Sequence, residues 1–308
     1  MDRLDAMAVF VAIAEAGSLT GAARRLKSPL TTVSRKLAAL EEHLGVQLVL
    51  RTTRRLAPTE AGTRYLRSCK RLLGEIEDAE RDAAGTHGTP HGDLHITAPI
   101  VFGRRHVLPI VRAFLAEHPQ VDIGLQLLDR PVSLIDEGLD VAIRIGHLTE
   151  ASLVATRLGI VRWVICASPR YLQTRGTLRT PSDLKRHDCI MMASTGSAAE
   201  WSFPSGIRER RTAIRARLTV NTAEAALDAA RAGLGLTRVL SYQAEPAIAL
   251  GKLRIVLADF EPPAIPVSLI YPEGRFMPAK TRAFIAFAVP RLRRLLASGE
   301  RQADNSEQ

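Results

Sequence analysis

The segment from Ser18 to Gly62 constrains the fold of this chain more than any other, because its residue patterns change period in a fixed order. With the residues before it, the segment carries three short helical patterns and then a strand pattern that returns after a basic tip. Gly17 can end the first helix, and Ser18 can cap the second. Pro29 suits the first turn of the third helix, where no backbone donor is needed. This order predicts a winged helix-turn-helix in residues 1–58.

The third helical pattern has one apolar and one polar face. The apolar stripe consists of Val33, Leu37, Leu40 and Leu44. Hydroxyl groups on the polar face can contact base edges or thymine methyl groups, and its cations can hold phosphates. We therefore expect a recognition helix that enters the major groove of double-stranded DNA. The expected DNA contacts of this helix are Pro29, Thr31, Thr32, Ser34, Arg35 and Lys36.

An alternating strand pattern in residues 46–50 leads into a cationic tip, and the chain returns at residues 56–58. A hairpin of this kind can straddle a phosphate backbone, so Arg51, Arg54 and Arg55 are expected to contact the DNA backbone or minor groove. A basic run is more often only a solvated surface. Here the run follows a hydroxyl-rich helix after a tight helical pair, which favours DNA contact.

A long helix is predicted from the N-cap Thr59 to about Ala84. Apolar residues recur along it at alternating spacings of four and three, as in a heptad seam. They are Tyr65, Cys69, Leu72, Ile76, Ala79 and Ala83. Polar residues surround this stripe, so residues 59–84 are expected to pair copies of the chain as a dimer or a dimer of dimers. The alternative is an amphipathic helix that packs on its own domain.

Residues 85–92 are rich in glycine and contain a proline, which predicts a linker between domains. His87, His91 and His95 recur every four residues, as metal ligands on one helix face do. The glycines and the proline within this spacing are incompatible with a helix, so we expect no metal site.

Length and composition predict two globular domains, because the 308 residues are 46% hydrophobic and 24% charged. The formal net charge of +10 favours a polyanionic partner, although residues 1–65 contribute only +4 of it. Cys69, Cys166 and Cys189 are far apart and odd in number, which fits a reducing cytosol rather than a disulfide framework. Since no uninterrupted apolar window of about 18 residues occurs, we expect a cytoplasmic protein without a membrane span.

Strand and helix patterns alternate through residues 93–297, which predicts a parallel-sheet α/β domain. A first set has strands near 94–96, 121–127 and 139–145, with helices at 105–117 and 132–137. A second set has strands near 163–167, 214–220 and 253–257, with helices near 181–185 and 222–232. A strand at 265–271 and a helix at 278–296 follow. The polar residues 298–308 are expected to form a disordered tail.

The N-terminal part resembles the signature of LysR-type transcriptional regulators. The matching runs are Ala22-Ala23-Arg24-Arg25-Leu26, Pro29-Leu30-Thr31-Thr32-Val33-Ser34-Arg35, Leu40-Glu41, Leu44-Gly45, Arg51-Thr52-Thr53-Arg54 and Thr59-Glu60-Ala61-Gly62. One position departs from the pattern, because the wing of the family usually has a phenylalanine where this chain has Val49 or Leu50, depending on the register.

Residues from Gly92 to about Leu296 resemble the effector domain of the same family, so the resemblance covers nearly the whole chain. The matching runs are Leu94-His95-Ile96-Thr97-Ala98-Pro99, Leu139-Asp140-Val141-Ala142-Ile143-Arg144-Ile145-Gly146, Cys166-Ala167-Ser168-Pro169-Arg170-Tyr171-Leu172, Asn221-Thr222-Ala223-Glu224-Ala225 and Ala232-Gly233-Leu234-Gly235-Leu236. The resemblance implies an α/β fold with two subdomains shaped like a periplasmic binding protein and joined by two crossovers. Subdomain I would comprise about 93–162 and 266–297, and subdomain II about 163–265.

Polar residues at predicted strand ends suggest where a small molecule would bind, because ligands of open α/β sheets lie beyond the carboxyl ends of strands. Arg144 could pair with a ligand carboxylate, and the helix start at Thr222 would favour it. By resemblance, the residues lining an effector cleft are Thr97, Pro99, Ile100, Arg144, Asn221, Thr222, Thr237 and Arg238. Alternatively, Thr97 and Thr222 only cap helices, and Arg144 only joins an ion pair with Asp140 or a neighbour. The expected effector is a small molecule, and an anion is favoured over a neutral or cationic compound. No cofactor is implied.

A second basic run is interpreted as the solvated edge of a sheet in preference to a DNA contact or an anion funnel. It consists of Arg208, Arg210, Arg211, Arg215 and Arg217. Enzyme signatures are weak, since Gly233-x-Gly235 is only half a dinucleotide fingerprint and Arg238 replaces the third glycine. The sequence therefore predicts a DNA-binding, effector-responsive regulator, with RNA polymerase as a further partner implied by the resemblance. Two alternatives stay open: an architectural DNA-binding protein without an effector, and an enzyme or solute-binding protein with an incidental helical N-terminus.

Overall fold

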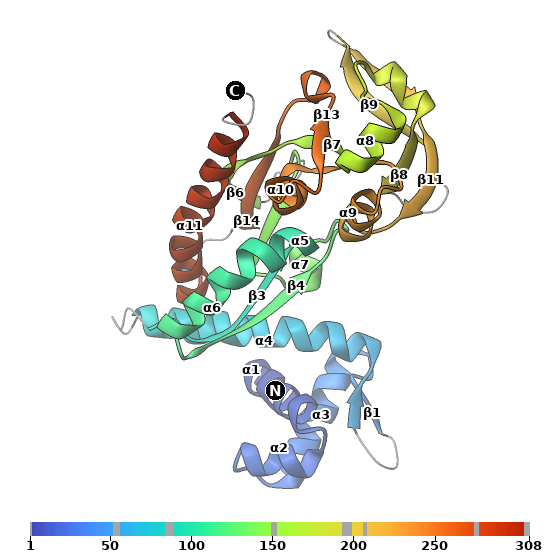
Figure 1. Cartoon of the computed structure of the whole chain (residues 1–308). Coiled ribbons are helices and arrows are strands. Elements are labelled where there is room, and N and C mark those ends of the chain that lie inside the picture. The colour runs from blue at the N-terminus through green and yellow to red at the C-terminus, as the bar shows by residue number, and fades with distance from the viewer. Residues whose placement is uncertain are drawn as a thin grey trace.

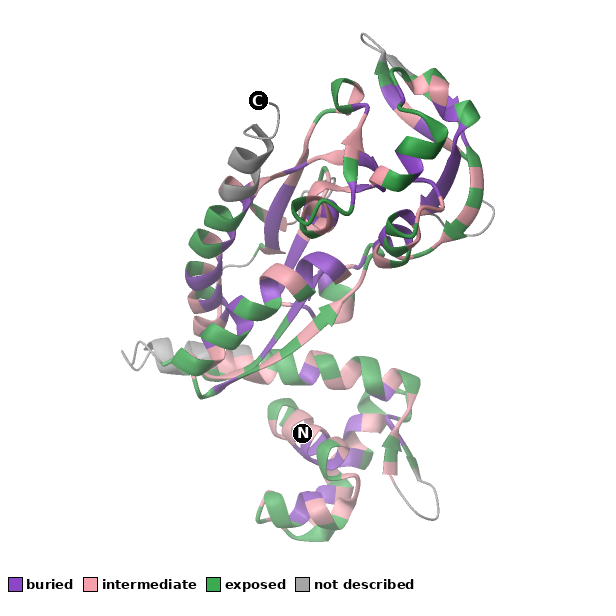
Figure 2. Ribbon diagram, in the orientation of Figure 1, coloured by how far each residue is buried: buried purple, intermediate pink, exposed green. Residues whose placement is uncertain are grey.

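The protein is described from a computed structural model that covers residues 2–51, 56–83, 89–148, 153–192, 199–205, 208–273 and 277–304 (Figure 1). Three parts follow one another along the chain: a helical N-terminal domain, a long helix, and a domain built on two five-stranded sheets. The long helix lies between the other two parts (Figure 1). Buried residues lie mainly on the strands and on the helix faces that cover them (Figure 2).

The N-terminal domain packs α1 (Arg3–Ala16), α2 (Leu19–Arg25) and α3 (Leu30–Leu44) around the fully buried Phe10. The predicted boundary between the first two helices is confirmed, because Gly17 ends α1 with a φ of 62° and the Ser18 hydroxyl caps α2. Pro29 is the N-cap of α3 and not part of its first turn. The predicted apolar stripe is wrong at Leu44, which is 36% exposed.

The wing is an antiparallel pair of β1 (Val49–Arg51) and β2 (Leu56–Pro58), and its tip, residues 52–55, lies outside the described residues. Val49 is buried and Leu50 is exposed. Of the two residues that could stand where the family usually has a phenylalanine, Val49 is therefore the one that points inward. Behind the wing, the Thr59 hydroxyl donates to the Gln47 carbonyl and accepts from the Gly62 N–H, both at 2.8 Å. The wing and the start of the next helix are therefore one packed unit.

The long helix α4 (Glu60–Ala83) uses its predicted seam in two ways. Tyr65 and the fully buried Cys69 pack into the core of the N-terminal domain, where the Tyr65 ring lies 5.9 Å from that of Phe10. Leu72 is exposed and Ile76 is partly exposed, while the side chains of Ala79 and Ala83 are not described. The prediction that the whole seam pairs two copies is therefore wrong for its first two members.

Subdomain I is a mixed sheet in the order β4-β3-β5-β14-β6. Its strands are β3 (Gly92–Ala98), β4 (Val121–Leu127), β5 (Val141–Ile145), β6 (Leu153–Val161) and β14 (Ile265–Pro272). Its helices are α5 (Ile100–Phe102), a π-helical turn (Gly103–Val107), α6 (Leu108–Glu117), α7 (Leu134–Glu137) and α11 (Ala279–Asp304). Because β14 pairs with β5 and β6, the return of the chain to the first sheet is confirmed.

Subdomain II is a second mixed sheet in the order β11-β8-β12-β7-β13. Its strands are β7 (Trp163–Ala167), β8 (Asp188–Met192), β11 (Arg215–Val220), β12 (Leu236–Leu240) and β13 (Arg254–Val256), and a separate hairpin joins β9 (Glu200–Ser205) to β10 (Arg208–Ala213). Its helices are α8 (Pro169–Arg175), α9 (Ala223–Arg231), α10 (Ser241–Ala249) and two 3-10 turns, Pro181–Arg186 and Ala258–Phe260. The arginine run predicted as a sheet edge is divided between two elements, because Arg215 and Arg217 lie in the edge strand β11, whereas Arg208, Arg210 and Arg211 lie in the hairpin strand β10.

Several expected boundaries need correction. Both sheets are mixed and not parallel, since β14 and β7 run antiparallel to their neighbours. The helix expected from Arg105 already begins at Ile100. The helix α11 continues to Asp304 into the expected disordered tail, and residues 305–308 lie outside the described part. Residues 84–88, which include His87 and the first half of the expected linker, also lie outside it.

No single helix in the described ranges has the length and apolar composition to cross a membrane. The pair α1 and α2 meets that test only when joined, and it is bent by 118°.

Candidate functional site

The exposed face of α3 carries the residues expected to contact DNA. Thr31 and Arg35 are exposed, and Thr32 and Ser34 are partly exposed beside them. Val33 and Leu37 on the opposite face are buried, which fixes the orientation of the helix. The structure thus presents hydroxyls and a guanidinium on one solvent-facing side of the amino-terminal half of α3, directly after the exposed N-cap Pro29.

Lys36 has a different environment from the other expected DNA contacts. Its ammonium forms an ion pair with the carboxylate of Asp5, in α1. This pair joins the first and third helices of the domain, so the structure gives Lys36 a contact within the protein. Glu15 of α1 also joins helices, because its carboxylate forms ion pairs with Arg25 of α2 and Lys70 of α4. The hydrogen bond from Lys70 is the main cause that lowers the pKa of Glu15.

The wing is fixed to α3 by Glu41, a contact that local sequence patterns do not predict. Its Oε1 accepts hydrogen bonds from the backbone N–H groups of Leu48, at 2.7 Å, and Val49, at 3.1 Å. This carboxylate therefore joins the base of the wing to the recognition helix. Arg54 and Arg55, and the side chain of Arg51, lie outside the described part of the chain.

Thr97 occupies the end of β3, where the first strand of subdomain I meets α5. It is fully buried, and its hydroxyl has no hydrogen-bond partner among the described residues. Buried hydroxyl groups are normally satisfied by protein, water or a ligand. Pro99 follows as the N-cap of α5, and the Ile100 N–H donates to the Asp129 carboxylate at 3.0 Å. That helix start therefore already has an acidic partner.

Arg144 and Thr222 lie at the two strand ends expected for them. Thr97 pairs with Ala142 of β5, and Arg144 is two residues further along the same strand. Thr222 caps α9 by accepting a hydrogen bond from the Ala225 N–H at 3.3 Å, and Asn221 before it is exposed. The capping role considered for Thr222 is thus present. Asp140 accepts a hydrogen bond from the His95 N–H at 2.7 Å, and burial raises its pKa.

Thr237 and Arg238 lie within β12, which begins directly after Gly235. The fully buried Thr237 donates its hydroxyl to the Ile190 carbonyl at 3.3 Å. Arg238 donates to the Ser202 carbonyl at 2.9 Å, and its guanidinium lies over the rings of Trp163 and Phe203. Both side chains therefore make structural contacts within subdomain II.

Two family models match the chain. The bacterial regulatory helix-turn-helix protein, lysR family, matches residues 4–63. The LysR substrate binding domain matches residues 87–293, which is more than half of the chain. This chain belongs to the LysR family of transcriptional regulators.

Relatives of this LysR-family regulator match along most of their length. An HTH-type transcriptional regulator of Xanthomonas campestris pv. campestris is 33% identical over 288 residues, which cover 92% of this chain and 84% of the relative. The HTH-type transcriptional activator AaeR of Escherichia coli is 32% identical over 286 residues, covering 92% of each chain. The structure of CrgA, a LysR-type regulator from Neisseria meningitidis, is similar with a TM-score of 0.60 at 29% identity, over 94% of this chain and 98% of CrgA. These matches confirm the predicted fold class and show a regulator and not an enzyme.

A contact between the two subdomains of this regulator was missed from sequence. The π-helical turn after α5 carries Arg104, which pairs with Glu224 in the first turn of α9. The adjacent Arg105 donates to the Tyr242 carbonyl and lies 3.7 Å from the Glu245 carboxylate of α10. Turns of π-helix are often found at functional positions. The spacing of apolar residues does not reveal such a turn, so the sequence contains no indication of this contact.

His106 of the same turn is enclosed by aromatic rings. Its ring centroid lies 4.9 Å from that of Phe102 and 5.9 Å from that of Tyr242 in α10. Burial is the main cause that lowers the pKa of His106 to about 4. The junction of the subdomains is thus an apolar contact flanked by two arginines.

A pocket of about 590 Å³ lies elsewhere on the effector domain, between α8, α9 and the turn after α10. It is lined by Ser168, Pro169, Arg170, Asp228, Arg231, Ala232 and Lys252. None of the expected effector-binding residues lies in this pocket. Its walls carry three cationic side chains against one carboxylate.

Proposed function

We propose that this LysR-family protein binds a specific DNA sequence through α3 and that a small molecule bound between its two subdomains modulates that binding or the DNA bend. The observation that carries the DNA part is the polar face of α3, where Thr31 and Arg35 are exposed beside Thr32 and Ser34. In this proposal these four side chains meet base edges or flanking phosphates in the major groove. Arg51, Arg54 and Arg55 hold the backbone or minor groove from the wing.

The effector part rests on the buried, unpartnered hydroxyl of Thr97 at the end of β3. A ligand that binds here would satisfy this hydroxyl, and Arg144 on the adjacent strand and the start of α9 at Thr222 would favour a carboxylate. The Asp129 carboxylate at Ile100 opposes an anion at the start of α5. We therefore place the acidic group of the ligand toward Arg144 and Thr222. Thr237 and Arg238 would support the site through the contacts that they make within subdomain II.

We also propose that two copies pair through the exposed part of α4 from Leu72 onward, either as a dimer or as a dimer of dimers. The first part of the seam is occupied by the N-terminal domain, whereas Leu72 is an exposed apolar residue on the same stripe. Two-fold symmetry then calls for a near-palindromic DNA site with half-sites spaced by helical turns. Such a regulator would act in the cytoplasm, with RNA polymerase as a partner of the DNA-bound form.

A gel-shift assay of the full-length protein on the intergenic DNA upstream of its own gene tests the proposal. A sequence-selective complex should survive competitor DNA and weaken as the salt concentration rises. Small acids added to that complex should change its mobility or its affinity. Failure of every fragment of the surrounding genome to bind selectively would reject the DNA part. Selective binding without a response to any acid would leave the architectural alternative.

A further inference from the structure

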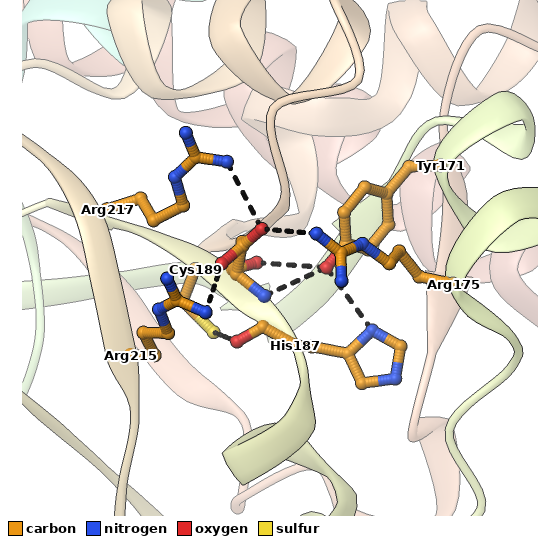
Figure 3. Close-up of polar contacts among 7 residues, drawn as sticks. Tyr171, Arg175, His187, Cys189, Arg215 and Arg217 are labelled. Carbon is orange, nitrogen blue, oxygen red and sulfur yellow. Dashed lines mark hydrogen bonds and ion pairs between the residues drawn. The ribbon is translucent and has the colours of Figure 1, made fainter.

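A buried carboxylate in subdomain II gathers three arginines that the proposed function does not use. Asp188 begins β8, and its side chain is only 5% exposed. The terminal nitrogens of Arg175 and Arg217 each lie 3.3 Å from its Oδ2, and a terminal nitrogen of Arg215 lies 3.5 Å from its Oδ1 (Figure 3). We call Asp188 and these three arginines the Asp188 cluster.

The Asp188 cluster lies at the other end of the sheet from the proposed effector cleft. Strands β8 and β11 run parallel, and Arg215 at the start of β11 is paired with Asp188 at the start of β8. Asn221 and Thr222, by contrast, follow the end of β11. The cluster and the cleft are therefore separated by the length of a strand.

Three elements fix the geometry of the cluster. Arg175 ends α8, while Arg215 and Arg217 lie in β11, whose register against β8 shifts between Ala216 and Leu218. Both β11 arginines reach the Asp188 carboxylate. The hydroxyl of Tyr171, also in α8, accepts a hydrogen bond from the Asp188 N–H at 2.9 Å. This bond holds the backbone of Asp188 against the helix that carries Arg175. The guanidinium groups are thus positioned before any ligand arrives.

The cluster has more positive charge than its carboxylate can balance. One carboxylate faces three guanidinium groups, and within the described residues no other acidic side chain forms an ion pair with them. The side chains of Arg175, Arg215 and Arg217 are 50%, 70% and 49% exposed. Each reaches Asp188 through one terminal nitrogen, and a guanidinium carries five N–H donors. Donors therefore remain for an anion that approaches from solvent.

The surroundings of the cluster reinforce the positive field. Residues 163–265 contain 14 Lys and Arg against 9 Asp and Glu, so half of the net charge of the chain lies in this subdomain. The pocket lined by Arg170, Arg231 and Lys252 adjoins the same helix, α8, that supplies Arg175. A surface of one sign raises the local concentration of counter-ions.

We propose that Arg175, Arg215 and Arg217, held in place by Asp188, bind the phosphate group of a small-molecule ligand. The excess of two positive charges matches a phosphate dianion better than a single carboxylate. Planar guanidinium groups also match the geometry of phosphate oxygens. In this arrangement Asp188 is a positioning residue that keeps the three arginines together in the absence of ligand, and the arginines are the binding residues.

Calorimetric titration of the full-length protein with inorganic phosphate, at constant ionic strength, tests the site. The wild-type protein should bind phosphate, and R175Q and R217Q should each weaken binding about tenfold, the order expected for one lost charge-assisted pair. R211Q is the matched control, because Arg211 is an exposed arginine on the neighbouring hairpin and pairs with Glu200. No phosphate binding by the wild type, or an equal loss in R211Q, would overturn the proposal.

A second variant separates binding from a purely structural role. In D188N the asparagine oxygen can still accept hydrogen bonds from the arginines and hold them together, but the negative charge that opposes the ligand is lost. A folded D188N should therefore bind phosphate more tightly than the wild type. Phosphate should also raise its melting temperature more. Circular dichroism checks folding, and if D188N does not fold, the arginine variants still decide. An unchanged phosphate affinity in folded D188N would contradict the proposal, as would R175Q and R217Q variants that weaken only duplex DNA binding.

Discussion

The Oε1 atom of Glu41 in α3 lies 2.7 Å from the backbone nitrogen of Leu48 at the base of the wing. The same oxygen accepts from the Val49 N–H, so one side chain fixes the two DNA-facing elements relative to each other. We expect E41A to lower the free energy of unfolding by about 1–3 kcal/mol, because it leaves two backbone donors without their partner. It should also weaken operator binding. Chemical denaturation and gel shifts measure both effects, and the exposed neighbour variant E42A should change neither.

Gly62 in the first turn of α4 cannot carry a side chain. A Cβ atom at this position would lie 1.9 Å from the Leu48 carbonyl oxygen. G62A should therefore destabilise the N-terminal domain by about 1–3 kcal/mol, the usual cost of overpacking. The control is G74A on the same helix, where a Cβ would meet nothing within 4 Å. Because alanine is the better helix former, G74A should gain up to about 1 kcal/mol in urea denaturation, and equal losses in the two variants would contradict the packing argument.

Arg35 should contribute to specific DNA binding without supporting the fold. It is exposed on α3, so R35A should leave the melting temperature unchanged while operator affinity falls by about 1–3 kcal/mol, the range of one base-specific contact. R130A removes an arginine from the effector domain, where Arg130 pairs with Glu137, and should bind the operator normally. Unchanged operator affinity in R35A would remove this residue from the interface.

The hydroxyl of Thr97 should serve a ligand and not the apoprotein. T97V keeps the shape of the side chain and removes a buried hydroxyl without a partner, so stability should hold or rise while the effector response is lost. T237V is the matched variant, because its hydroxyl donates to the Ile190 carbonyl. T237V should lose about 1 kcal/mol of stability. Effector titrations and thermal melts distinguish the two, and a normal response in T97V would refute the proposed contact.

The half-buried ring of His106 should make the effector domain sensitive to acid. Its pKa is lowered to about 4 in the folded protein, whereas an unfolded histidine titrates near 6.5. Between these two pH values the unfolded chain binds more protons than the folded protein. The contribution of the neutral His106 ring to the free energy of unfolding is therefore fully present above about pH 6.5 and is lost as the pH falls toward 4. Urea denaturation at pH 7 and pH 5 should show a smaller loss in H106Q than in the wild type. H147Q, which changes an exposed histidine, should behave as the wild type.

Local signals in the sequence predicted the N-terminal domain well, because its helix boundaries depend on residues at the boundaries themselves. Gly17 adopts a left-handed conformation and Ser18 caps the next helix, as their types suggest. The apolar stripe of α4 is visible in the sequence, but its packing partner is not, because a stripe does not specify which residues cover it. Phe10 of the same chain covers Tyr65, and only the stripe beyond Cys69 is left for a partner.

The effector domain was less predictable from local patterns. Strand β8 begins with Asp188, and the hairpin strand β10 is rich in arginine, so neither shows the alternation of a half-buried strand. Their pairing is decided by distant residues. The candidate site shows the same division, because Thr97 and Thr222 follow from strand ends, whereas the contacts of Arg238 with Trp163 and Phe203 arise from three separate strands.

The close approach of Gly62 to Leu48 has a mechanical consequence. Because the first turn of α4 packs on the base of the wing, we expect the N-terminal domain and α4 to move together as one unit. Arg67 on the same helix lies beside Gly138 of subdomain I, so the effector domain contacts this unit through α4. Movement in the effector domain would then change the angle and spacing between the two N-terminal domains of a dimer on a DNA duplex. The internal structure of each N-terminal domain would stay the same.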